Sequence, residues 1–476
     1  MKNNISRATI NGNVTTRVPT GISYVDSNAT IENTIFLKPG KWRKSMAKKS
    51  TTLRGSSIVE GRRMTMQLAD YQASQTLVDV TNKTIADDDG PQSEMHNVSL
   101  QQFHTPVVSM KTVTDQCYLR LKSARNEVFQ RCGQQEPISF EQMVDKLQIT
   151  IKRKIGEGVY GEVFLCIKAN GEQCVLKLIP IEGSMLINGE RQKTFEEILS
   201  EVIITAELSN LRQRNVQFST DGFVELRNVS CVMGQYPSQL VDLWRDYNKK
   251  HGSENDSPEE FSQDQQYIVF ETAYGGTDLD SFRFKNANEM FSIFTQIVLT
   301  LAIAEQRYDF EHRDLHTGNI LIERTKEKQR NFYLLGEEIV IQTHKLKATI
   351  IDYTLSRVVY NGLCLFNDLS TEEELFTAEG DYQFEIYRSM KTVLKNEWNV
   401  YSPKTNVHWL HYLLDKLICN RSSGKVTQDH KAVLQSMKDL RDVLLEFNSA
   451  HEIVQNYITS PAGDAHKENS KPIPPS

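Results

Sequence analysis

The chain has 476 residues, of which 39% are hydrophobic and 9% aromatic, and its formal net charge is −6. This length can hold two to four domains, and the lean apolar content indicates that part of the chain does not pack into a core. The weak negative charge excludes a general attraction to nucleic acid or to anionic membranes. Any such contact would have to come from a local basic patch.

Seven cysteines are scattered along the chain without a CxxC pair. An odd number of scattered thiols is typical of reduced proteins of the cytosol or nucleus. The amino terminus lacks the apolar core of a signal peptide, and the most apolar stretch, residues 294–304, is too short to span a bilayer. We therefore expect no membrane contact.

Residues 1–135 are rich in Ser, Thr, Asn and Gln and have few sustained apolar periods, which predicts a mostly disordered arm. Within it, residues 36–65 hold nine Lys and Arg residues against the single acid Glu60. Such a run is typical of a nuclear address or a chromatin contact. A solvated charge run without a receptor is the alternative, and composition does not separate the two.

Residues 136–271 predict a strand-rich lobe. The segment from Phe140 has helical spacing, and LQITIKRKI after it alternates apolar and polar residues as a half-buried strand does. Glycines separate the next apolar runs, so we expect hairpins and an antiparallel sheet. From Thr194 to Leu208 the apolar residues recur with helical periodicity behind a threonine cap, which predicts one amphipathic helix.

A second, mainly helical lobe is predicted for residues 277–458, after a short connection at residues 272–276. Its first strong signal is the apolar segment 291–304, and further helical patterns follow towards the carboxyl end. Residues 459–476 are polar and end in prolines, so we expect a disordered tail there.

The motif IGEGVYGEVF lies between two apolar runs of the first lobe. Its glycines leave a backbone without side chains to block close approach, so its N–H groups could cover nucleotide phosphates. A strand rather than a helix follows, which disfavours a dinucleotide fold, although a plain turn is an alternative for the motif alone. The residues assigned to this loop are Ile155, Gly156, Glu157, Gly158, Val159, Gly161 and Val163.

Lys177 lies between apolar neighbours in the predicted strand CVLKLI, 16 residues after Gly161. An isolated ammonium group in such a place would be costly to bury, whereas a phosphate and a carboxylate would satisfy it. The carboxylate should come from the following helix, where Glu196, Glu197 and Glu201 are candidates. A lysine that reaches solvent from an edge strand is the plainer alternative.

The motif HRDLHTGN places Asp314 five residues before Asn319. Asp314 can accept a hydroxyl proton as a catalytic base, and Asn319 can bind a metal ion through its amide oxygen. Asp352 follows the apolar run ATII, and a carboxylate there can hold Mg²⁺ against the β- and γ-phosphates of ATP. Each acid alone is more often a turn or cap residue, but together and in this order they predict a nucleotide-dependent phosphotransferase.

Residues 145–458 resemble the eukaryotic protein kinase fold. The blocks IEGSMLINGERQKTFEEILSE, HRDLHTGN, IIDYTLSR and GDYQFEIYRSM further resemble the haspin family of atypical kinases. Two departures from ordinary kinases agree with that family: DYT stands in place of DFG, and no APE follows, since the first proline after Asp352 is Pro403. The resemblance implies an α+β fold with a small antiparallel β lobe plus a helix and a larger, mainly helical lobe. It also aligns Glu201 with the glutamate that pairs with the strand lysine.

The resemblance also assigns residues near the nucleotide. It makes Thr272 the gatekeeper of the hinge at residues 272–276, with the register open by two residues. Backbone groups from Ala273 to Gly275 are then expected to bind adenine, and a small threonine would leave a back pocket open. Asp278, just past the hinge, is implied to lie near the ribose and the substrate mouth.

Substrate contacts are implied by the same resemblance, because haspin-family kinases act on the strongly basic tail of histone H3. His316 is expected to help place the target threonine, although a histidine packed on a backbone carbonyl is the alternative. Glu372 and Glu374 are expected to grip the tail, although a solvated acidic loop is the alternative. Asp381 is expected to be a buried helix carboxylate that braces the HRD loop. The acids of this segment are Asp368, Glu372, Glu373, Glu374, Glu379, Asp381 and Glu385.

Taken together, these residues predict a haspin-like serine/threonine protein kinase that uses ATP and Mg²⁺. The resemblance implies a histone H3 substrate, work on mitotic chromatin in the nucleus with the cytoplasm as the other compartment, a monomer, and no sequence-specific nucleic-acid binding. It also implies that the activation segment is ordered and active by itself. An arginine before the catalytic aspartate, here Arg313, would ordinarily indicate control by phosphorylation of that segment. A small-molecule kinase of the aminoglycoside or choline type shares DLHxGN without APE, and a catalytically silent chromatin-binding module is the third alternative.

Overall fold

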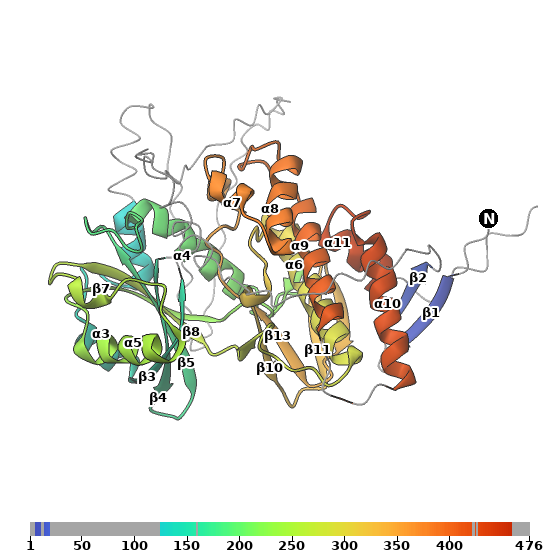
Figure 1. Cartoon of the computed structure of the whole chain (residues 1–476), viewed down its shortest axis with the longest axis horizontal. Helices are drawn as coiled ribbons and strands as arrows, with labels where there is room; N and C mark the ends of the chain where they lie inside the picture. Colours follow the sequence, from blue (N-terminus) through green and yellow to red (C-terminus); the bar gives the residue numbers. More distant parts are fainter. Residues whose placement is uncertain are drawn as a thin grey trace, which may run out of the picture.

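The computed structural model describes residues 5–10, 14–19, 124–158, 160–420, 424 and 427–458. A lobe built on a β-sheet lies beside a larger, mainly helical lobe (Figure 1). This bilobal α+β arrangement is the one that the sequence predicts. The basic segment 36–65 and the tail 459–476 lie outside the described residues.

The first lobe is built on a five-stranded antiparallel sheet, as the glycine-separated apolar runs predict. The strand order is β3-β4-β5-β8-β7, so that β5 lies at the centre and β8 joins it to an edge strand. The strands are β3 (Ile149–Gly158), β4 (Gly161–Lys168), β5 (Gln173–Ile181), β7 (Leu226–Met233) and β8 (Gln266–Ala273).

Helices cover both faces of this sheet. α4 (Phe195–Asn210) packs on the face that carries Phe270, whereas α3 (Phe140–Leu147) and α5 (Ser238–His251) pack on the face that carries Val269. The alternation along β8 divides the lobe into two apolar clusters. The amphipathic helix predicted after Thr194 is α4, and Thr194 closes a capping box at its start.

A helix lies before the predicted arm boundary at residue 135. Residues 124–132 form a helix, and Val128, Phe129 and Cys132 on it are buried. The ring of Phe129 lies 5.8 Å from that of Phe195, at the start of α4. The prediction of a disordered arm up to residue 135 is therefore wrong at its carboxyl end, because a single short apolar stripe was hidden among polar residues.

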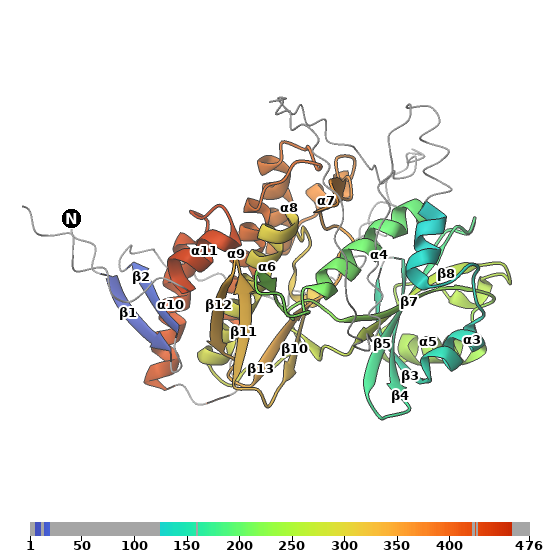
Figure 2. The same cartoon turned by 180° about the vertical axis from the view of Figure 1, so that it is seen from behind.

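A hairpin also lies within the stretch assigned to the arm. β1 (Ile5–Ile10) and β2 (Val14–Pro19) pair antiparallel, and they lie beside α10 (Gln428–Leu444) in both views (Figures 1 and 2). The sequence signal for these strands was weak because each has only six residues, with Ser, Arg and Pro among them.

The second lobe is arranged around α6 (Ala287–Tyr308), and Figure 2 shows a layer of strands on its outer side. Two small sheets, β13-β10-β9 and β12-β11-β6, form that layer. The remaining elements are β6 (Phe218–Ser219), η1 (Pro258–Glu260), β9 (Thr277–Asp278), η2 (Thr317–Asn319), β10 (Ile320–Arg324), β11 (Gln329–Leu334), β12 (Glu337–Gln342), β13 (Leu346–Ile350), β14 (Val358–Tyr360), β15 (Leu363–Leu365), α7 (Glu373–Thr377), α8 (Tyr382–Val393), α9 (Lys404–Cys419), α11 (Ala450–Ile453) and the π-helical turn η3 (Val454–Ile458).

α6 is longer than the apolar segment seen in the sequence. Among the described residues it is the one helix long and apolar enough to cross a membrane, but its most apolar window is 100% buried inside the protein. The helix therefore forms the core of the second lobe, with the other helices and the strands packed around it.

Candidate active site

Lys177 lies in β5, directly across from Phe270 of β8. Its Nζ is 2.8 Å from Oε1 of Glu201 on α4 and 3.6 Å from Oδ1 of Asp352. Of the three glutamates that the sequence offers, Glu201 is the buried one, whereas Glu197 closes the capping box at the start of the helix. The structure thus resolves which carboxylate meets the strand lysine.

A second cation also contacts Glu201. Nζ of Lys193 is 2.7 Å from Oε2, so each oxygen of this buried carboxylate meets one ammonium group. Burial alone would raise the pKa of Glu201, but Lys177 and Lys193 outweigh it and lower the pKa. Burial alone would lower the pKa of Lys177, and the carboxylates of Asp352 and Glu201 raise it instead. Lys177 therefore stays positively charged, as phosphate binding requires.

The glycine-rich motif forms the hairpin between β3 and β4, where Gly158 pairs with Gly161. A Cβ at Gly161 would lie 2.0 Å from the carbonyl oxygen of Leu178, so close packing on β5 requires this glycine. A Cβ at Gly158 would meet no atom within 4 Å, so the hairpin is open there. Ile155, Gly156, Glu157 and Gly158 lie in β3, Gly161 and Val163 lie in β4, and Val159 lies outside the described residues.

Residues 253–255, which follow α5, hold this hairpin from one side. Oε1 of Glu157 accepts a hydrogen bond from the backbone N–H of Glu254 at 3.0 Å, and its Oε2 is 2.6 Å from Nζ of Lys154. Nδ2 of Asn255 donates to the carbonyl oxygens of Gly158 at 3.1 Å and Gly161 at 3.3 Å. We call residues 253–255 the hairpin clasp; no local sequence signal pointed to it.

The gatekeeper position lies at the end of β8. Thr272 is two residues after Phe270, and side chains alternate along a strand, so both lie on the face that packs on α4. Lys177 lies opposite Phe270 in the register and shares that face. Thr272 and Ala273 are half-buried, and their contact with a nucleotide stays a prediction.

The hinge passes tightly over β10. A Cβ at Gly275 would lie 2.8 Å from Cδ1 of Leu321, and one at Gly276 would lie 2.2 Å from the carbonyl oxygen of Ile322. Gly276 also has a φ of +98°, which disfavours other residues. Asp278 then pairs with Leu321, and its Oδ1 accepts a hydrogen bond from the backbone of Ser281. The two glycines therefore bring Asp278 next to β10, at the carboxyl end of the catalytic loop.

The catalytic loop runs between α6 and β10. Nδ2 of Asn319 donates to the carbonyl oxygen of Asp314 at 2.8 Å, which folds the loop back on itself. Burial raises the pKa of Asp314 well above its usual range, and the nearby carboxylate of Asp352 acts in the same direction. His312 is fully buried, and its Nε2 lies 3.2 Å from the carbonyl oxygen of Ile351, so the loop is tied to the residue before Asp352.

Asp352 has a φ of +62°, an uncommon backbone conformation for a residue with a side chain. Its Oδ1 accepts hydrogen bonds from Oγ1 of Thr354 at 2.7 Å and from the backbone N–H of Thr354 at 3.2 Å. Burial alone would raise the pKa of Asp352, but Lys177 and the hydrogen bonds from Thr354 lower it below its usual range. The carboxylate is therefore held ionised next to Lys177.

Asn319 and Asp352 together fit a divalent cation. Because Nδ2 of Asn319 is a donor to Asp314, its Oδ1 is the atom that can act as a ligand. The backbone N–H of Ile351 donates to the carbonyl oxygen of Asn319 at 3.0 Å, which keeps the two ligand residues close. Among the described residues no group of three or more His, Cys, Asp or Glu can hold a metal ion. An amide and a carboxylate oxygen suit Mg²⁺, which completes its coordination with phosphate and water oxygens.

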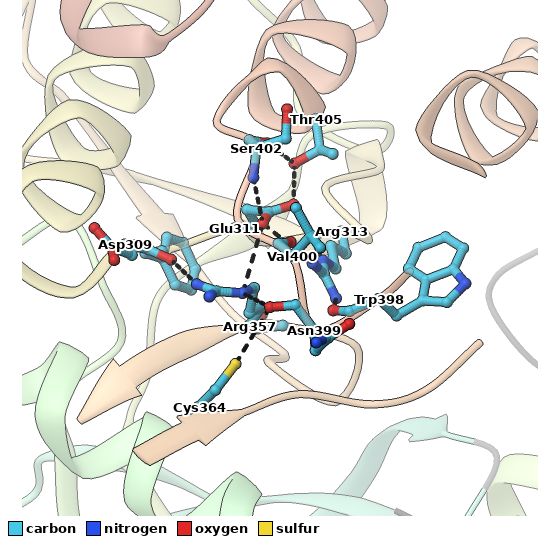
Figure 3. Close-up of polar contacts among 12 residues, drawn as sticks. Asp309, Glu311, Arg313, Arg357, Cys364, Trp398, Asn399, Val400, Ser402 and Thr405 are labelled. Carbon is cyan, nitrogen blue, oxygen red and sulfur yellow. Dashed lines mark hydrogen bonds and ion pairs between the residues drawn. The ribbon is translucent and has the colours of Figure 1, made fainter. Parts of the chain in front are cut away.

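Arg313, next to the catalytic aspartate, is satisfied from within the fold (Figure 3). Its guanidinium is fully buried and bonds both oxygens of Glu311, at 3.1 and 3.2 Å. It also donates to the carbonyl oxygens of Trp398 at 2.7 Å and Val400 at 3.2 Å. Since these acceptors already use the guanidinium, a phosphorylated side chain is not needed to order it.

The same glutamate connects the catalytic loop to α9 and to the segment after DYT. Oε2 of Glu311 accepts a hydrogen bond from Oγ1 of Thr405 at 2.7 Å, and Oε1 accepts one from the backbone of Ser402 at 2.9 Å. Arg357 donates to the carbonyl oxygens of Asp309 and Asn399, both at 2.9 Å (Figure 3). This network fixes the segment without an APE motif.

The residues predicted to meet a substrate fall into two groups. His316 is buried in the catalytic loop, where its Nδ1 accepts a hydrogen bond from the backbone N–H of Gly318 at 3.0 Å, and Asp278 lies beside the same loop. Glu372 and Glu374 lie at the start of α7, which packs against α8. Glu374 is exposed. The structure therefore brings the first pair to the catalytic loop and places the second pair on a separate helix.

Asp381 does not brace the HRD loop, contrary to the prediction. It caps the start of α8 by accepting a hydrogen bond from Gln383, and its Oδ2 is 2.8 Å from Nζ of Lys416 on α9. Another residue of α8, Tyr387, donates a hydrogen bond to Oδ1 of Asp314. An acid at the start of a helix often caps it, and Asp381 has this role.

These features define the bilobal protein-kinase fold, with its lysine–glutamate pair, its catalytic aspartate and a metal-binding pair of residues. A family model described as a haspin-like kinase domain matches residues 95–457. The chain therefore belongs to the haspin-like kinase family.

Three curated relatives are similar over most of this chain. A serine/threonine-protein kinase haspin homolog of Drosophila melanogaster is 42% identical, over 70% of this chain and 60% of its own length. The serine/threonine-protein kinase haspin of Mus musculus is 44% identical, over 72% of this chain and 45% of its own length. A serine/threonine-protein kinase haspin homolog of Arabidopsis thaliana is 37% identical, over 69% of this chain and 54% of its own length. The match thus spans only about half the length of these relatives.

Proposed function

We propose that this chain transfers the γ-phosphate of ATP to a threonine near the amino terminus of histone H3, with Mg²⁺ as the metal. The observation that carries the phosphotransfer is that Lys177, Asp352, Asn319 and Asp314 meet at one place through the contacts described above. The curated relatives, which are named serine/threonine-protein kinases, support the same activity.

Each of these residues has a distinct task in the proposed reaction. Lys177, held by Glu201, offers an ammonium group to the phosphates of the nucleotide. Asp352 and Asn319 present oxygen ligands to Mg²⁺, which when bound neutralises the phosphate charge. Asp314 orients the acceptor hydroxyl and takes its proton.

A basic acceptor peptide is favoured because acids gather beside the catalytic loop. Burial raises the pKa of Asp280, and the nearby carboxylates of Asp278 and Asp381 act in the same direction. Exposed ion pairs contribute about 0.2 to 1 kcal/mol each, whereas hydrogen bonds to charged groups contribute roughly 1.5 to 3 kcal/mol. A tail with a free amino terminus, arginine and lysine would satisfy such acids.

The test is incorporation of labelled phosphate into a histone H3 tail peptide by the purified full chain with ATP and Mg²⁺. We expect one phosphothreonine near the peptide amino terminus by mass spectrometry, and a strong loss of turnover when the Lys and Arg residues of the peptide are replaced by Gln. Asp314→Asn should abolish incorporation while the protein still binds ATP.

Matched acceptors separate this proposal from the other readings. Label that appears only in small alcohols such as choline would overturn the choice of a protein substrate. Label in unrelated peptides but not in the H3 tail would leave a protein kinase and refute the histone assignment. A wild-type protein that is as inert as Asp314→Asn towards every acceptor would favour a binding module without catalysis.

We also propose that the chain acts in the nucleus, on mitotic chromosomes. The support is the basic composition of residues 36–65, which is typical of a nuclear address or a contact with phosphate-rich chromatin. Deletion of these residues should reduce nuclear retention of a fluorescent fusion, whereas deletion of an equally long acidic or neutral stretch of the arm should not. Unchanged localisation would refute the role of residues 36–65 as a nuclear localisation signal.

A further inference from the structure

Tyr387 contacts the catalytic carboxylate directly. It lies on α8, 73 residues after Asp314 in the sequence, and its Oη donates a hydrogen bond to Oδ1 of that aspartate. Its side chain is 2% exposed. Tyr387 lies in the block GDYQFEIYRSM, but no motif in the sequence indicated a contact with Asp314.

The packing around α8 fixes where the tyrosine hydroxyl can lie. The ring of Tyr387 meets the ring of Trp409 on α9 edge to face, with centroids 5.3 Å apart. The start of α8 is held by Asp381, which caps the helix and pairs with Lys416 of α9. Because the ring is buried and packed against Trp409, its hydroxyl has little room to move, and it therefore limits the rotation of the carboxylate that it binds.

The carboxylate of Asp314 has few other groups that could orient it. Besides Tyr387, the side chains of Asn319 and Asp352 influence the pKa of this carboxylate. Burial and Asp352 raise the pKa of Asp314, whereas the hydrogen bond from Tyr387 lowers it and so favours the ionised carboxylate. Such a bond to an ionised group is about twice as strong as one between neutral groups. The hydrogen bond from Tyr387 engages Oδ1, so we assign Oδ2 as the oxygen that faces an acceptor.

We propose that Tyr387 is a positioning residue for the phosphotransfer: its hydroxyl binds Oδ1 of Asp314 and thereby directs Oδ2 to the hydroxyl of the acceptor. The acceptor proton passes to Oδ2 while a bond forms between the acceptor oxygen and the γ-phosphorus. The bond from that phosphorus to the bridging oxygen breaks, and its electron pair leaves with ADP. Tyr387 keeps its own proton throughout.

The inference rests on the proposed phosphotransfer but not on the identity of the substrate. The assay therefore uses the full chain with the best acceptor from a degenerate Ser/Thr peptide library that also contains the H3 tail sequence. Tyr387→Phe removes only the hydroxyl and keeps the ring on Trp409. The matched control is Tyr382→Phe, because Tyr382 is also on α8 and its Oη bonds Nδ1 of His411 at 2.8 Å, away from Asp314.

A positioning role predicts a loss in kcat without a loss in binding. We expect Tyr387→Phe to lower kcat about 10- to 100-fold, as removal of a hydrogen bond to a charged group does, and to leave KM for ATP and for the peptide within about twofold. Tyr382→Phe should keep kcat within about twofold of wild type. Rates are divided by the ATP-binding fraction from titration, so partial misfolding cannot imitate the loss.

Given an active wild type, three results would overturn the proposal. The first is a Tyr387→Phe variant with the kcat of wild type. The second is a fall in peptide KM with kcat unchanged or higher, which would mean that the tyrosine hydroxyl occupies the place of the acceptor hydroxyl. The third is a rise in the KM values for both ATP and the peptide, together with a fall in Tm, which would mean a purely structural role. If wild type labels no library peptide, the phosphotransfer itself fails, and the proposal fails with it.

Discussion

His312 is held neutral by its surroundings. It is fully buried, its Nδ1 accepts a hydrogen bond from the backbone N–H of Asp314 at 3.3 Å, and its Nε2 faces the carbonyl oxygen of Ile351. A second proton would have to displace the acceptor role of Nδ1. Burial therefore lowers the pKa of His312 from its ordinary value to about 4, against an opposing effect of Asp352.

This shift predicts how stability depends on pH. The folded state binds fewer protons than the unfolded state, so the stabilisation is complete above pH 6.5 and is lost as pH falls towards 4. Between pH 7 and pH 5 wild type should lose about 2 kcal/mol more unfolding free energy than His312→Phe, which cannot titrate there. Urea unfolding of both proteins at the two pH values measures this. Equal losses in both proteins would show that His312 titrates normally.

Single residues show what the sequence could predict and what it could not. Lys177 was identifiable because a lone cation in an apolar strand needs a partner, but its partner was left open among three glutamates. The choice depends on the phase of α4, which Glu197 sets by capping the helix. The role of Tyr387 could not be predicted, because its contact with Asp314 depends on how α8 packs on α9. No local sequence pattern indicates such a contact between residues far apart in the chain.

At the scale of elements, the hairpin clasp connects α5 to the glycine-rich hairpin. Oγ of Ser253 donates to Glu157 at 2.8 Å, and Nδ2 of Asn255 reaches both strands of the hairpin. Lys154, buried under the aromatic face of Tyr247 on α5, completes the contact with Glu157. A glycine-rich hairpin would otherwise be mobile, so the clasp holds it in place before a nucleotide binds.

Removal of the clasp should weaken nucleotide binding more than catalysis. Asn255→Ala removes the hydrogen bonds to Gly158 and Gly161, and each is expected to contribute about 0.5 to 1.5 kcal/mol. We expect KM for ATP to rise about threefold to tenfold, with kcat changed less than twofold. Asn331→Ala is the control, because its amide bonds exposed Glu338 on β12. An unchanged KM for ATP in Asn255→Ala would show that the clasp is dispensable.

The elements that the sequence predicted best have long, regular apolar periods. α4 and α6 follow such periods, and the five strands of the first sheet follow alternation between glycines. The helix at residues 124–132 was missed because only Ala124, Val128, Phe129 and Cys132 mark its buried side, within a strongly polar stretch. The polar composition of this stretch therefore led to a prediction of disorder, although a short helical pattern is present in it.

For the molecule as a whole, this missed helix supports the active site. Arg125 lies over the rings of Phe129 and Phe195, at 5.0 and 5.8 Å, so the helix braces the start of α4. α4 in turn carries Glu201, the partner of Lys177. The kinase fold is thus completed by residues upstream of the predicted lobe boundary, in agreement with a family match that begins at residue 95.

Two truncations test where the folded kinase begins. Removal of residues 1–94 keeps the helix at residues 124–132 and should leave kcat close to that of the full chain, with a loss in Tm limited to what the β1–β2 hairpin contributes beside α10. Removal of residues 1–135 should cost about 3 to 6 kcal/mol, since Val128 and Phe129 each lose about 1.5 to 3 kcal/mol of burial. It should also lower kcat, because α4 loses its brace and Glu201 its fixed place. Phe129→Ala in the full chain isolates the packing term and should cost about 3 to 5 kcal/mol. Equal stability of both truncations would mean that α4 holds Glu201 without help from the upstream helix.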